Sequence, residues 1–226
     1  MRISSFNINK FCGAYSSING GYYNPRNIPF KLQIKNIVDN VLRDIDDIIF
    51  LQEFIENQYV DVLNLFNKEK YTIFSNSNYK KIKSSVVAMT LKGSTWEKED
   101  FHQEIEFSNK IIEMRMKDLK VLSFHNTDDN IKKIINSYFQ EKNVDIIIGD
   151  FNNIKWIDTL KKEEKMEYRD LVTNEMITYK PAQTAIDRVF IKKEIDSKLI
   201  VFNGIIETFA SDHNLLSFLL NWIGKK

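Results

Sequence analysis

The sequence predicts an α/β protein whose strands form covered sheets. One observation is the run of β-branched apolar residues at 146–148, which is typical of a buried strand. Another is the helical spacing of apolar residues within 34–45 and 131–139, between predicted strands. Because most of the strands are apolar rather than strictly alternating, we expect helices to cover the outer faces of the sheets.

The first half of the chain alternates strand and helix patterns. Alternating or continuous apolar residues predict strands at 3–8, 47–52, 71–74, 86–91 and 111–116. Apolar residues spaced three and four apart predict helices over 34–45 and 60–66. A long polar and aromatic loop follows the first strand at 10–29, and loops of this length are often functional.

The second half continues the same arrangement. We predict strands at 119–124, 146–149, 185–191, 199–202 and 215–220. Asp128 can cap a helix whose apolar face lies within 131–139. The segment 156–167 is rich in Lys and Glu and amphipathic. No short repeat interrupts this organisation.

Composition favours one globular domain over residues 1–226. The chain is 43% hydrophobic, and it has no linker rich in Ser, Gly and Pro. A net charge of +1 argues against a polycationic nucleic-acid coat or a membrane-surface binder, but it leaves room for a local basic groove. Cys12 is the only cysteine, which excludes an intrachain disulfide. With no signal-peptide pattern and no apolar run near the roughly 18 residues of a membrane span, we expect a cytoplasmic protein.

Polar side chains gather where the predicted strands end. These residues are Asn7, Glu53, His125, Asp150, Asn152, Asp187, Asp212 and His213. Ordinary structural roles are the alternative. Asp and Asn favour turns, Glu53 could be a charge in the first turn of a helix, where the helix dipole favours it, and His125 could be a solvated loop residue. As a set they offer oxygen and nitrogen ligands without a thiolate, which selects Mg²⁺, Mn²⁺ or Ca²⁺ over Zn²⁺. The two histidines add acid–base capacity, so the set suits hydrolysis of a phosphate ester.

Asp187 is the hardest of these residues to dismiss. It lies inside an apolar strand, where a charge needs a partner. Arg188 points to the other face of that strand and is therefore not the natural partner. A histidine is a good candidate, because a carboxylate fixes its tautomer and stabilises its cation.

The order of the motifs resembles the endonuclease/exonuclease/phosphatase superfamily, whose members have the DNase I-like fold. The motifs are Ser-Phe-Asn-Ile with Asn7, Leu-Gln-Glu with Glu53, His125, Gly-Asp-Phe-Asn with Asp150 and Asn152, Ile-Asp-Arg with Asp187, and Ser-Asp-His with Asp212 and His213. The resemblance spans almost the whole chain. It implies a four-layer α-β-β-α sandwich, in which two mixed sheets pack face to face, and metal-dependent hydrolysis of phosphoesters.

The resemblance also implies a role for each residue. Glu53 would be the principal ligand of Mg²⁺, with Mn²⁺ or Ca²⁺ as alternatives, and Asn7 and Asp212 would assist it. His213 would be the general base, oriented by Asp187. Asp150 and Asn152 would position water and phosphate, and His125 would bind a phosphate oxygen or assist the leaving group. Asn9 stands where some members carry a second acidic metal-site residue.

The branch of the superfamily bears on the substrate. A histidine at position 125 and an Asp-Arg pair at 187–188 are similar to what DNase I carries at these motif positions. A histidine at position 125 is also similar to the sphingomyelinases and the inositol-phosphate phosphatases. We expect substrate contacts from Asn9, Arg188 and the basic loop before Val86, which carries Tyr79, Lys80 and Lys83. The alternative for this loop is a solvated lysine loop.

Three functions follow, in order of preference. The first is an intracellular phosphodiesterase that cuts nucleic acid, with DNA favoured. The second is hydrolysis of a small phosphoester, such as a nucleotide, inositol phosphate or lipid headgroup, which the near-neutral charge favours. The third is an inactive binding protein on the same scaffold. The sequence predicts no oligomeric state.

Overall fold

The computed structural model describes most of the chain. The described residues are 1–11, 35, 47–55, 62–65, 70–76, 84–99, 108–141, 143–163, 166–195, 200–206 and 211–221. All of the predicted helix at 34–45 except residue 35, and most of the loop at 10–29, lie outside these residues. The part of the basic loop that carries Tyr79, Lys80 and Lys83 also lies outside them.

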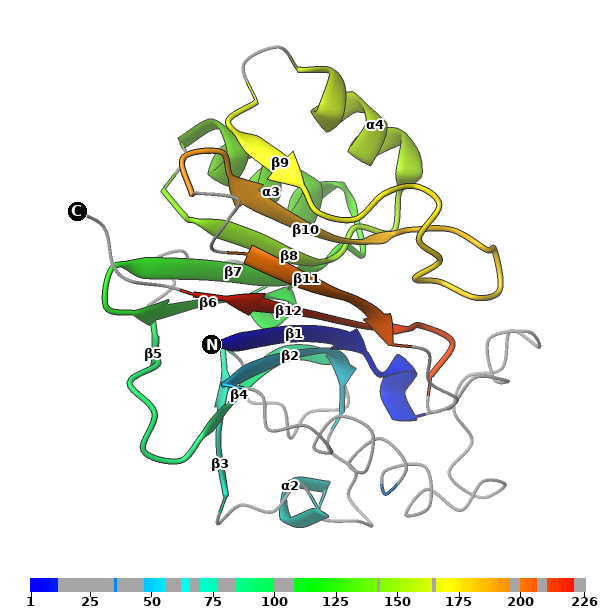
Figure 1. Cartoon of the computed structure of the whole chain (residues 1–226). Coiled ribbons are helices and arrows are strands. Elements are labelled where there is room, and N and C mark those ends of the chain that lie inside the picture. Colours follow the sequence, from blue (N-terminus) through cyan, green and yellow to red (C-terminus); the bar gives the residue numbers. More distant parts are fainter. Residues whose placement is uncertain are drawn as a thin grey trace.

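The first sheet has six strands in the order β11-β12-β1-β2-β4-β3 (Figure 1). Their bounds are β1 Arg2–Asn7, β2 Ile48–Phe54, β3 Tyr71–Ser75, β4 Ser85–Leu91, β11 Ile200–Ile206 and β12 Leu215–Leu220. The central strands β1 and β2 are parallel, and every other neighbouring pair is antiparallel. This sheet therefore joins the two ends of the described chain.

The second sheet also has six strands, in the order β5-β6-β7-β8-β10-β9. Their bounds are β5 Glu97–Lys98, β6 Ile111–Met116, β7 Leu119–His125, β8 Ile146–Asp150, β9 Tyr168–Asp170 and β10 Asp187–Lys192. Here β7 and β8 form the parallel pair. The two sheets are thus mixed, as predicted.

The sheets pack face to face around a shared apolar core. Ile3 and Phe50 from the first sheet cluster with Val121 and Ile148 from the second, and all four are fully buried. Burial of apolar surface from both sheets is the main force that holds the sandwich together.

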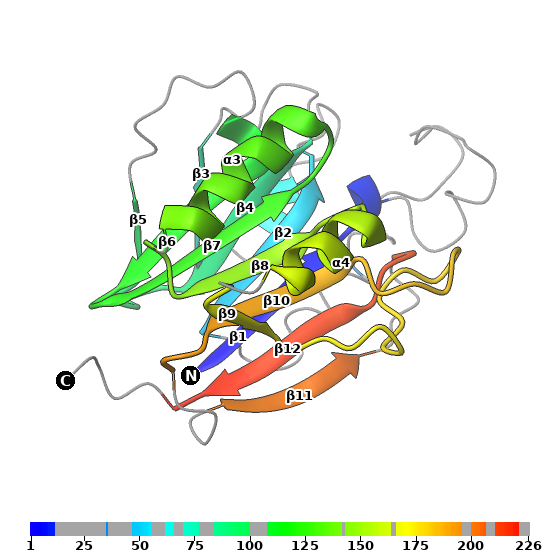
Figure 2. The ribbon, with the colours of Figure 1, turned by 90° about the horizontal axis from the view of Figure 1, so that it is seen from above.

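Helices cover the outer faces of the sandwich. Helix α3 (Asp129–Glu141) and helix α4 (Ile154–Lys162) lie on the second sheet (Figure 2). Their apolar faces form a second core with strand residues such as Phe190. On the first sheet, Val62 of α2 (Val62–Leu65) packs in a third cluster with β2 and β4 residues. The expected two-sheet α/β sandwich is confirmed.

Local signals explain where the helices begin. Asp128 Oδ1 accepts hydrogen bonds from the backbone N–H of Asn130 at 2.8 Å and of Ile131 at 3.2 Å, so Asp128 caps α3 as predicted. Asn153 caps α4 in the same way by accepting from the Trp156 N–H at 3.0 Å. Helix α4 therefore begins before the predicted segment 156–167 and ends earlier, at Lys162. In the described part of the chain, no helix is long and apolar enough to cross a membrane.

Candidate active site

The topology brings the polar strand ends to one edge of the sandwich. Because β1 and β2 are parallel, Asn7 pairs with Gln52 at their carboxyl ends. Because β7 and β8 are parallel, His125 pairs with Asp150. Strand β10 runs antiparallel to β8, so its first residue, Asp187, lies opposite Asp150. Strand β12 is antiparallel to β1, and residues 211–214 before it reach the same edge.

Gly149 permits the close approach of β7 and β8 beneath the site. Its φ is +151°, and a Cβ at this position would lie 2.1 Å from the backbone oxygen of Phe124. Only glycine fits this contact without moving a strand. The glycine before Asp150 is therefore needed to place the two strand ends side by side.

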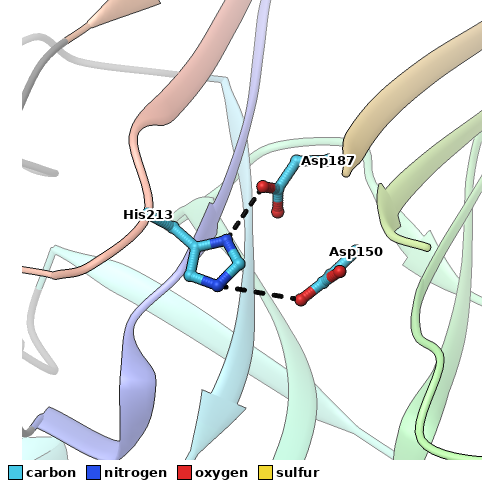
Figure 3. Close-up of side chains that lie close together, drawn as sticks. All are labelled: Asp150, Asp187 and His213. Atoms are coloured by element: carbon cyan, nitrogen blue, oxygen red, sulfur yellow. Dashed lines mark hydrogen bonds and ion pairs between the residues drawn. The ribbon is translucent and has the colours of Figure 1, made fainter. Parts of the chain in front are cut away.

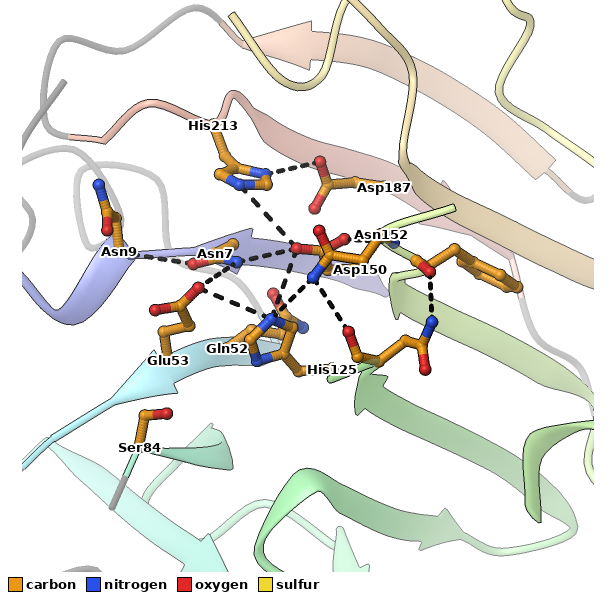
Figure 4. A network of polar contacts seen from close by, with 12 residues as sticks. Asn7, Asn9, Gln52, Glu53, Ser84, His125, Asp150, Asn152, Asp187 and His213 are labelled. Atoms are coloured by element: carbon orange, nitrogen blue, oxygen red, sulfur yellow. Dashed lines mark hydrogen bonds and ion pairs between the residues drawn. The ribbon is translucent and has the colours of Figure 1, made fainter. Parts of the chain in front are cut away.

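The Asn7 amide joins carboxylates from both sheets (Figure 4). Its Nδ2 donates to Glu53 Oε1 at 3.3 Å and to Asp150 Oδ2 at 3.0 Å. Its Oδ1 accepts from the Asn9 backbone N–H at 2.9 Å, which fixes the amide orientation. Asn7 is almost fully buried, so these contacts are shielded from water.

Glu53 projects into this cluster from an irregular point in β2. The register of β2 against β4 shifts between Leu51 and Phe54, and Glu53 has a left-handed φ of 57°. Sparsely populated backbone conformations of this kind concentrate at functional sites. Its carboxylate contacts Lys10 Nζ at 3.2 Å and His125 Nε2 at 3.6 Å. Burial raises the pKa of Glu53, but these neighbours and Asn7 outweigh burial, so the pKa lies below its usual value.

His125 and Asn152 form the side of the cluster on the second sheet. Asn152 Nδ2 donates to His125 Nε2 at 3.2 Å and to the Asn126 backbone oxygen at 3.0 Å. Asn152 also has a left-handed φ, of 52°, and its backbone N–H donates to Asp150 Oδ1 at 2.8 Å. Burial lowers the pKa of His125 to about 4, so its ring is neutral at neutral pH.

His213 and Asp187 form a buried imidazole–carboxylate pair (Figure 3). His213 Nδ1 lies 2.8 Å from Asp187 Oδ2, and His213 Nε2 lies 3.9 Å from Asp150 Oδ2. Asp187 is held in place by its backbone N–H, which donates to Thr178 Oγ1 at 2.9 Å. Burial disfavours the charged ring, but Asp187 and Asp150 outweigh burial and raise the pKa of His213 to about 10.

Asp150 lies at the centre of the cluster. It is 1% exposed and contacts Asn7, His125 and His213 from three different strands or loops. Burial and the charge of Asp187 raise its pKa to about 7. The site therefore holds more negative charge than its own cations balance, which favours binding of a cation.

Asp212 and Asn9 contact the cluster indirectly. Asp212 is 4% exposed, and its Oδ1 lies 3.2 Å from Ser211 Oγ. The single proton of this hydroxyl goes to the shorter contact, the Asn7 backbone oxygen at 2.7 Å, which ties the Asp212 segment to β1. Asn9 contacts Asn7 through its backbone N–H.

Arg188 is not brought to the site, and the expected substrate contact for it is wrong. The side chain is 1% exposed and ion-pairs with Asp170 Oδ2 at 3.0 Å. Its other amino group donates to Asn174 Oδ1 at 2.6 Å. Successive residues of a strand face opposite sides, so Arg188 must point away from the side that Asp187 occupies.

Three residues near the site were not predicted. Tyr179 pairs with His213 through an isolated β-bridge, and their ring centroids lie 4.9 Å apart. Lys10 contacts Glu53, and Gln52 lies buried beside it. Only Gln52 had a local signal, because it belongs to the Leu-Gln-Glu motif. Tyr179 forms isolated β-bridges with Thr184 and His213, and such single pairings have no sequence signature.

The donor chemistry fits a hard divalent cation. Asp150, Asp187 and His213 each offer a ligand atom within 4.8 Å of the others. Asp187 and His213 Nδ1 already satisfy each other, whereas Glu53 and Asp150 present carboxylate oxygens on either side of the Asn7 amide. Glu53 and Asp150 therefore offer the oxygens that could hold the ion, and Asn7 could add its Oδ1 only if its amide turned away from the hydrogen bonds that it makes to the two carboxylates and to the Asn9 N–H.

Solved structures share this fold over nearly the whole chain. The endonuclease domain of TRAS1, a telomere-specific non-LTR retrotransposon, has a TM-score of 0.64 and 12% identity, and 97% of each chain is covered. TDP2 from D. rerio, complexed with single-strand DNA product, has a TM-score of 0.66 and 15% identity over 98% of this chain and 99% of its own. The catalytic domain of human Nocturnin with bound sulfate has a TM-score of 0.59 and 13% identity over 97% and 93%. No protein-family model and no curated protein matches the sequence.

The chain has the DNase I-like fold that these solved structures share. The fold that the ordered motifs implied is therefore confirmed.

Proposed function

We propose that the protein is a metal-dependent phosphodiesterase that hydrolyses nucleic acid, with DNA as the favoured substrate. The observation that carries this proposal is the His213–Asp187 pair, which faces Asp150 at the edge where Glu53 and Asn7 also lie (Figure 4). A general base, a carboxylate that orients it and a set of hard-cation ligands are what phosphodiester hydrolysis requires.

In this proposal His213 Nε2 takes the proton of the attacking water. Asp187 holds the ring through Nδ1 and stabilises the imidazolium that forms. Asp150 and Asn152 orient the water and the phosphate, and Asp212 supports the ligand set. His125 binds a phosphate oxygen or assists the leaving group, for which its Nε2 gives up the hydrogen bond that it accepts from Asn152. Glu53, with Asn7 beside it, would hold Mg²⁺ or Mn²⁺, which would supply positive charge that offsets the carboxylates around His213 and stabilises the charge of the transition state.

Two structural neighbours support nucleic acid as the substrate. One is described as a retrotransposon endonuclease domain, and the other was solved with a single-strand DNA product. The net charge of +1 instead favours a small phosphoester, which remains the second candidate. Substrate contacts by Tyr79, Lys80 and Lys83 are part of the first proposal only.

The deciding experiment is an activity panel. Supercoiled plasmid, single-stranded DNA, RNA and small phosphodiesters are each incubated with Mg²⁺, Mn²⁺ or EDTA. We expect metal-dependent cleavage of nucleic acid, and a loss of about 10²- to 10⁴-fold in His213→Gln, which removes the base. Lys117→Met, in the turn between β6 and β7, serves as the control that should keep full activity. Turnover confined to small phosphoesters would select the second candidate, and intact substrates throughout would reject both.

A further inference from the structure

An unusual left-handed turn follows β1. Asn9, Lys10 and Phe11 have φ values of 45°, 51° and 62°, and none of them is glycine. Such conformations are disfavoured for most residues other than glycine, so three in succession require compensation from the surrounding structure.

Buried contacts hold this turn in place. Phe11 is fully buried and packs edge-to-face on Phe54, with ring centroids 5.6 Å apart. The Ile8 N–H donates to the Gln52 backbone oxygen at 3.1 Å, and the Phe11 N–H donates to the Ile8 oxygen at 2.9 Å. The turn is therefore anchored to β2 on both sides of Lys10, at the point where β2 presents Glu53.

The anchored turn places the Lys10 ammonium on Glu53. Nζ lies 3.2 Å from Oε2, while the other carboxylate oxygen contacts Asn7 and His125. Of these three side chains, Lys10 is the one that meets Glu53 as an ammonium–carboxylate ion pair.

We propose that Lys10 is a built-in counter-ion of the cation site. Its ammonium occupies Glu53 until a divalent cation displaces it, and it then contacts the phosphate of the substrate. This inference rests on the proposed metal-dependent function. The ordinary alternative is a surface ion pair, because the Lys10 side chain is 40% exposed. An ordinary ion pair would not need three strained residues to form it.

The two interpretations predict opposite effects on metal binding. In the counter-ion interpretation, Lys10→Met removes a competitor, so the protein alone should bind Mn²⁺ about fivefold more tightly than the unmodified protein. A residue that supports the site structurally would weaken binding when it is replaced. The measurement is a titration of Mn²⁺ by electron paramagnetic resonance, with no substrate present.

Two further variants complete the titration. Lys10→Arg keeps the charge and should bind Mn²⁺ like the unmodified protein. Lys117→Met removes another exposed lysine with a left-handed φ, of 56°, at a turn between strands β6 and β7, and should also leave binding unchanged. On the best nucleic-acid substrate, Lys10→Met should in addition lower kcat/KM about tenfold, because a charged contact to phosphate is lost.

The outcomes separate this inference from the proposed function. Unchanged or weaker Mn²⁺ binding in Lys10→Met would overturn the counter-ion role, even if the enzyme cleaves nucleic acid. Tighter binding in Lys10→Met with no turnover by the unmodified protein would support the counter-ion role and reject the proposed function alone.

Discussion

One amide nitrogen links the two halves of the site. Asn7 Nδ2 donates to Glu53 of the first sheet and to Asp150 of the second. The environments of these two carboxylates differ, so the pKa of Glu53 is lowered while burial and Asp187 raise the pKa of Asp150 to about 7. Two neighbouring carboxylates with divergent pKa values are typical of a reaction centre.

Burial of neutral His125 gives the metal-free protein an acid-sensitive group. Its pKa is about 4 in the fold against an ordinary value of 6.5, so protonation favours the unfolded chain. Its stabilising contribution is therefore present above pH 6.5 and lost as the pH falls toward 4, by on the order of 3 kcal/mol. Urea unfolding across this range, with EDTA present, should show a steeper acid loss in the unmodified protein than in His125→Gln.

The comparison with His125→Gln is needed because other groups titrate nearby. The raised pKa of Asp150 makes protonation stabilising, so Asp150 opposes His125 as the pH falls from about 7. The contribution of His213 is fully present below its ordinary pKa of 6.5 and is lost only as the pH rises through about 10. Parallel pH profiles for the two proteins would show that His125 is not buried in its neutral form.

At the residue scale, the sequence predicted which kind of side chain Asp187 needs as a partner, but it did not predict the contacts of Glu53. The partner of Asp187 was predictable, because a carboxylate in an apolar strand requires one and His213 was available. Contacts of Glu53 with Lys10 and His125 were not, since they depend on a bulge and a left-handed turn that no residue type signals. The predicted roles in catalysis and metal binding stay predictions.

At the scale of the element, the close approach of β7 and β8 depends on Gly149. We expect Gly149→Ala to lower the free energy of unfolding by about 3 kcal/mol, because the methyl group would overlap Phe124 backbone. Gly93→Ala is the matched control. Gly93 also has a positive φ, of +83°, but nothing lies within 4 Å of its Cβ position, so only a backbone cost of roughly 1 kcal/mol is expected. If chemical denaturation gave equal losses of unfolding free energy for Gly149→Ala and Gly93→Ala, the close approach of β7 and β8 would not be the reason for glycine at position 149.

Gln52 joins three strands just beneath the site. Its Nε2 donates to Ser5 Oγ of β1 at 2.9 Å and to Ser123 Oγ of β7 at 3.1 Å. Ser5 and Ser123 each stand two residues before a site residue, Asn7 and His125, on the same face of their strands. The Gln52 side chain therefore fixes the position of β7 in the second sheet relative to β1 and β2 in the first sheet, next to the site.

Replacing Gln52 should lower the free energy of unfolding, and replacing its two serine partners as well should restore most of the loss. Gln52→Leu leaves two buried hydroxyls without their donor, and we expect a loss of about 1–3 kcal/mol in urea unfolding. Adding Ser5→Ala and Ser123→Ala should recover most of that loss, because neither buried hydroxyl is then left without its donor. Ser4→Ala removes a buried hydroxyl that has no hydrogen-bond partner among the described residues and should cost nothing. A triple variant less stable than Gln52→Leu would contradict the bridge.

Long periodic elements were predictable and short ones were not. The strands β6 and β12 match their predicted bounds, since apolar alternation or a continuous run marks them. Strand β5, Glu97–Lys98, and strand β9, Tyr168–Asp170, were missed because two or three residues carry no periodicity and pair only in the folded sheet. Strand β2 runs beyond its predicted end because the bulge lets pairing resume at Phe54.

On the scale of the whole molecule, the two sheets repeat one pattern of strand directions. Each has a parallel pair at its centre, β1–β2 or β8–β7, and antiparallel strands outside it. Each sheet therefore brings the ends of its parallel pair and the start of a neighbouring antiparallel strand to one edge (Figure 1). Sequence motifs predicted this sandwich through their order, but the repeated pattern became evident only in the structure.

A double-mutant cycle between Asn7 and Asp150 tests most directly whether the sheets build one reaction centre. These residues come from different sheets and share a hydrogen bond of 3.0 Å. The hydrolysis rate is measured for Asn7→Ala, for Asp150→Ala and for both together, on the substrate that the panel selects. Because residues that act as a unit are non-additive, we expect the double variant to be no slower than the slower single variant, within a few-fold. Losses that multiply in the double variant would contradict a single centre formed by both sheets.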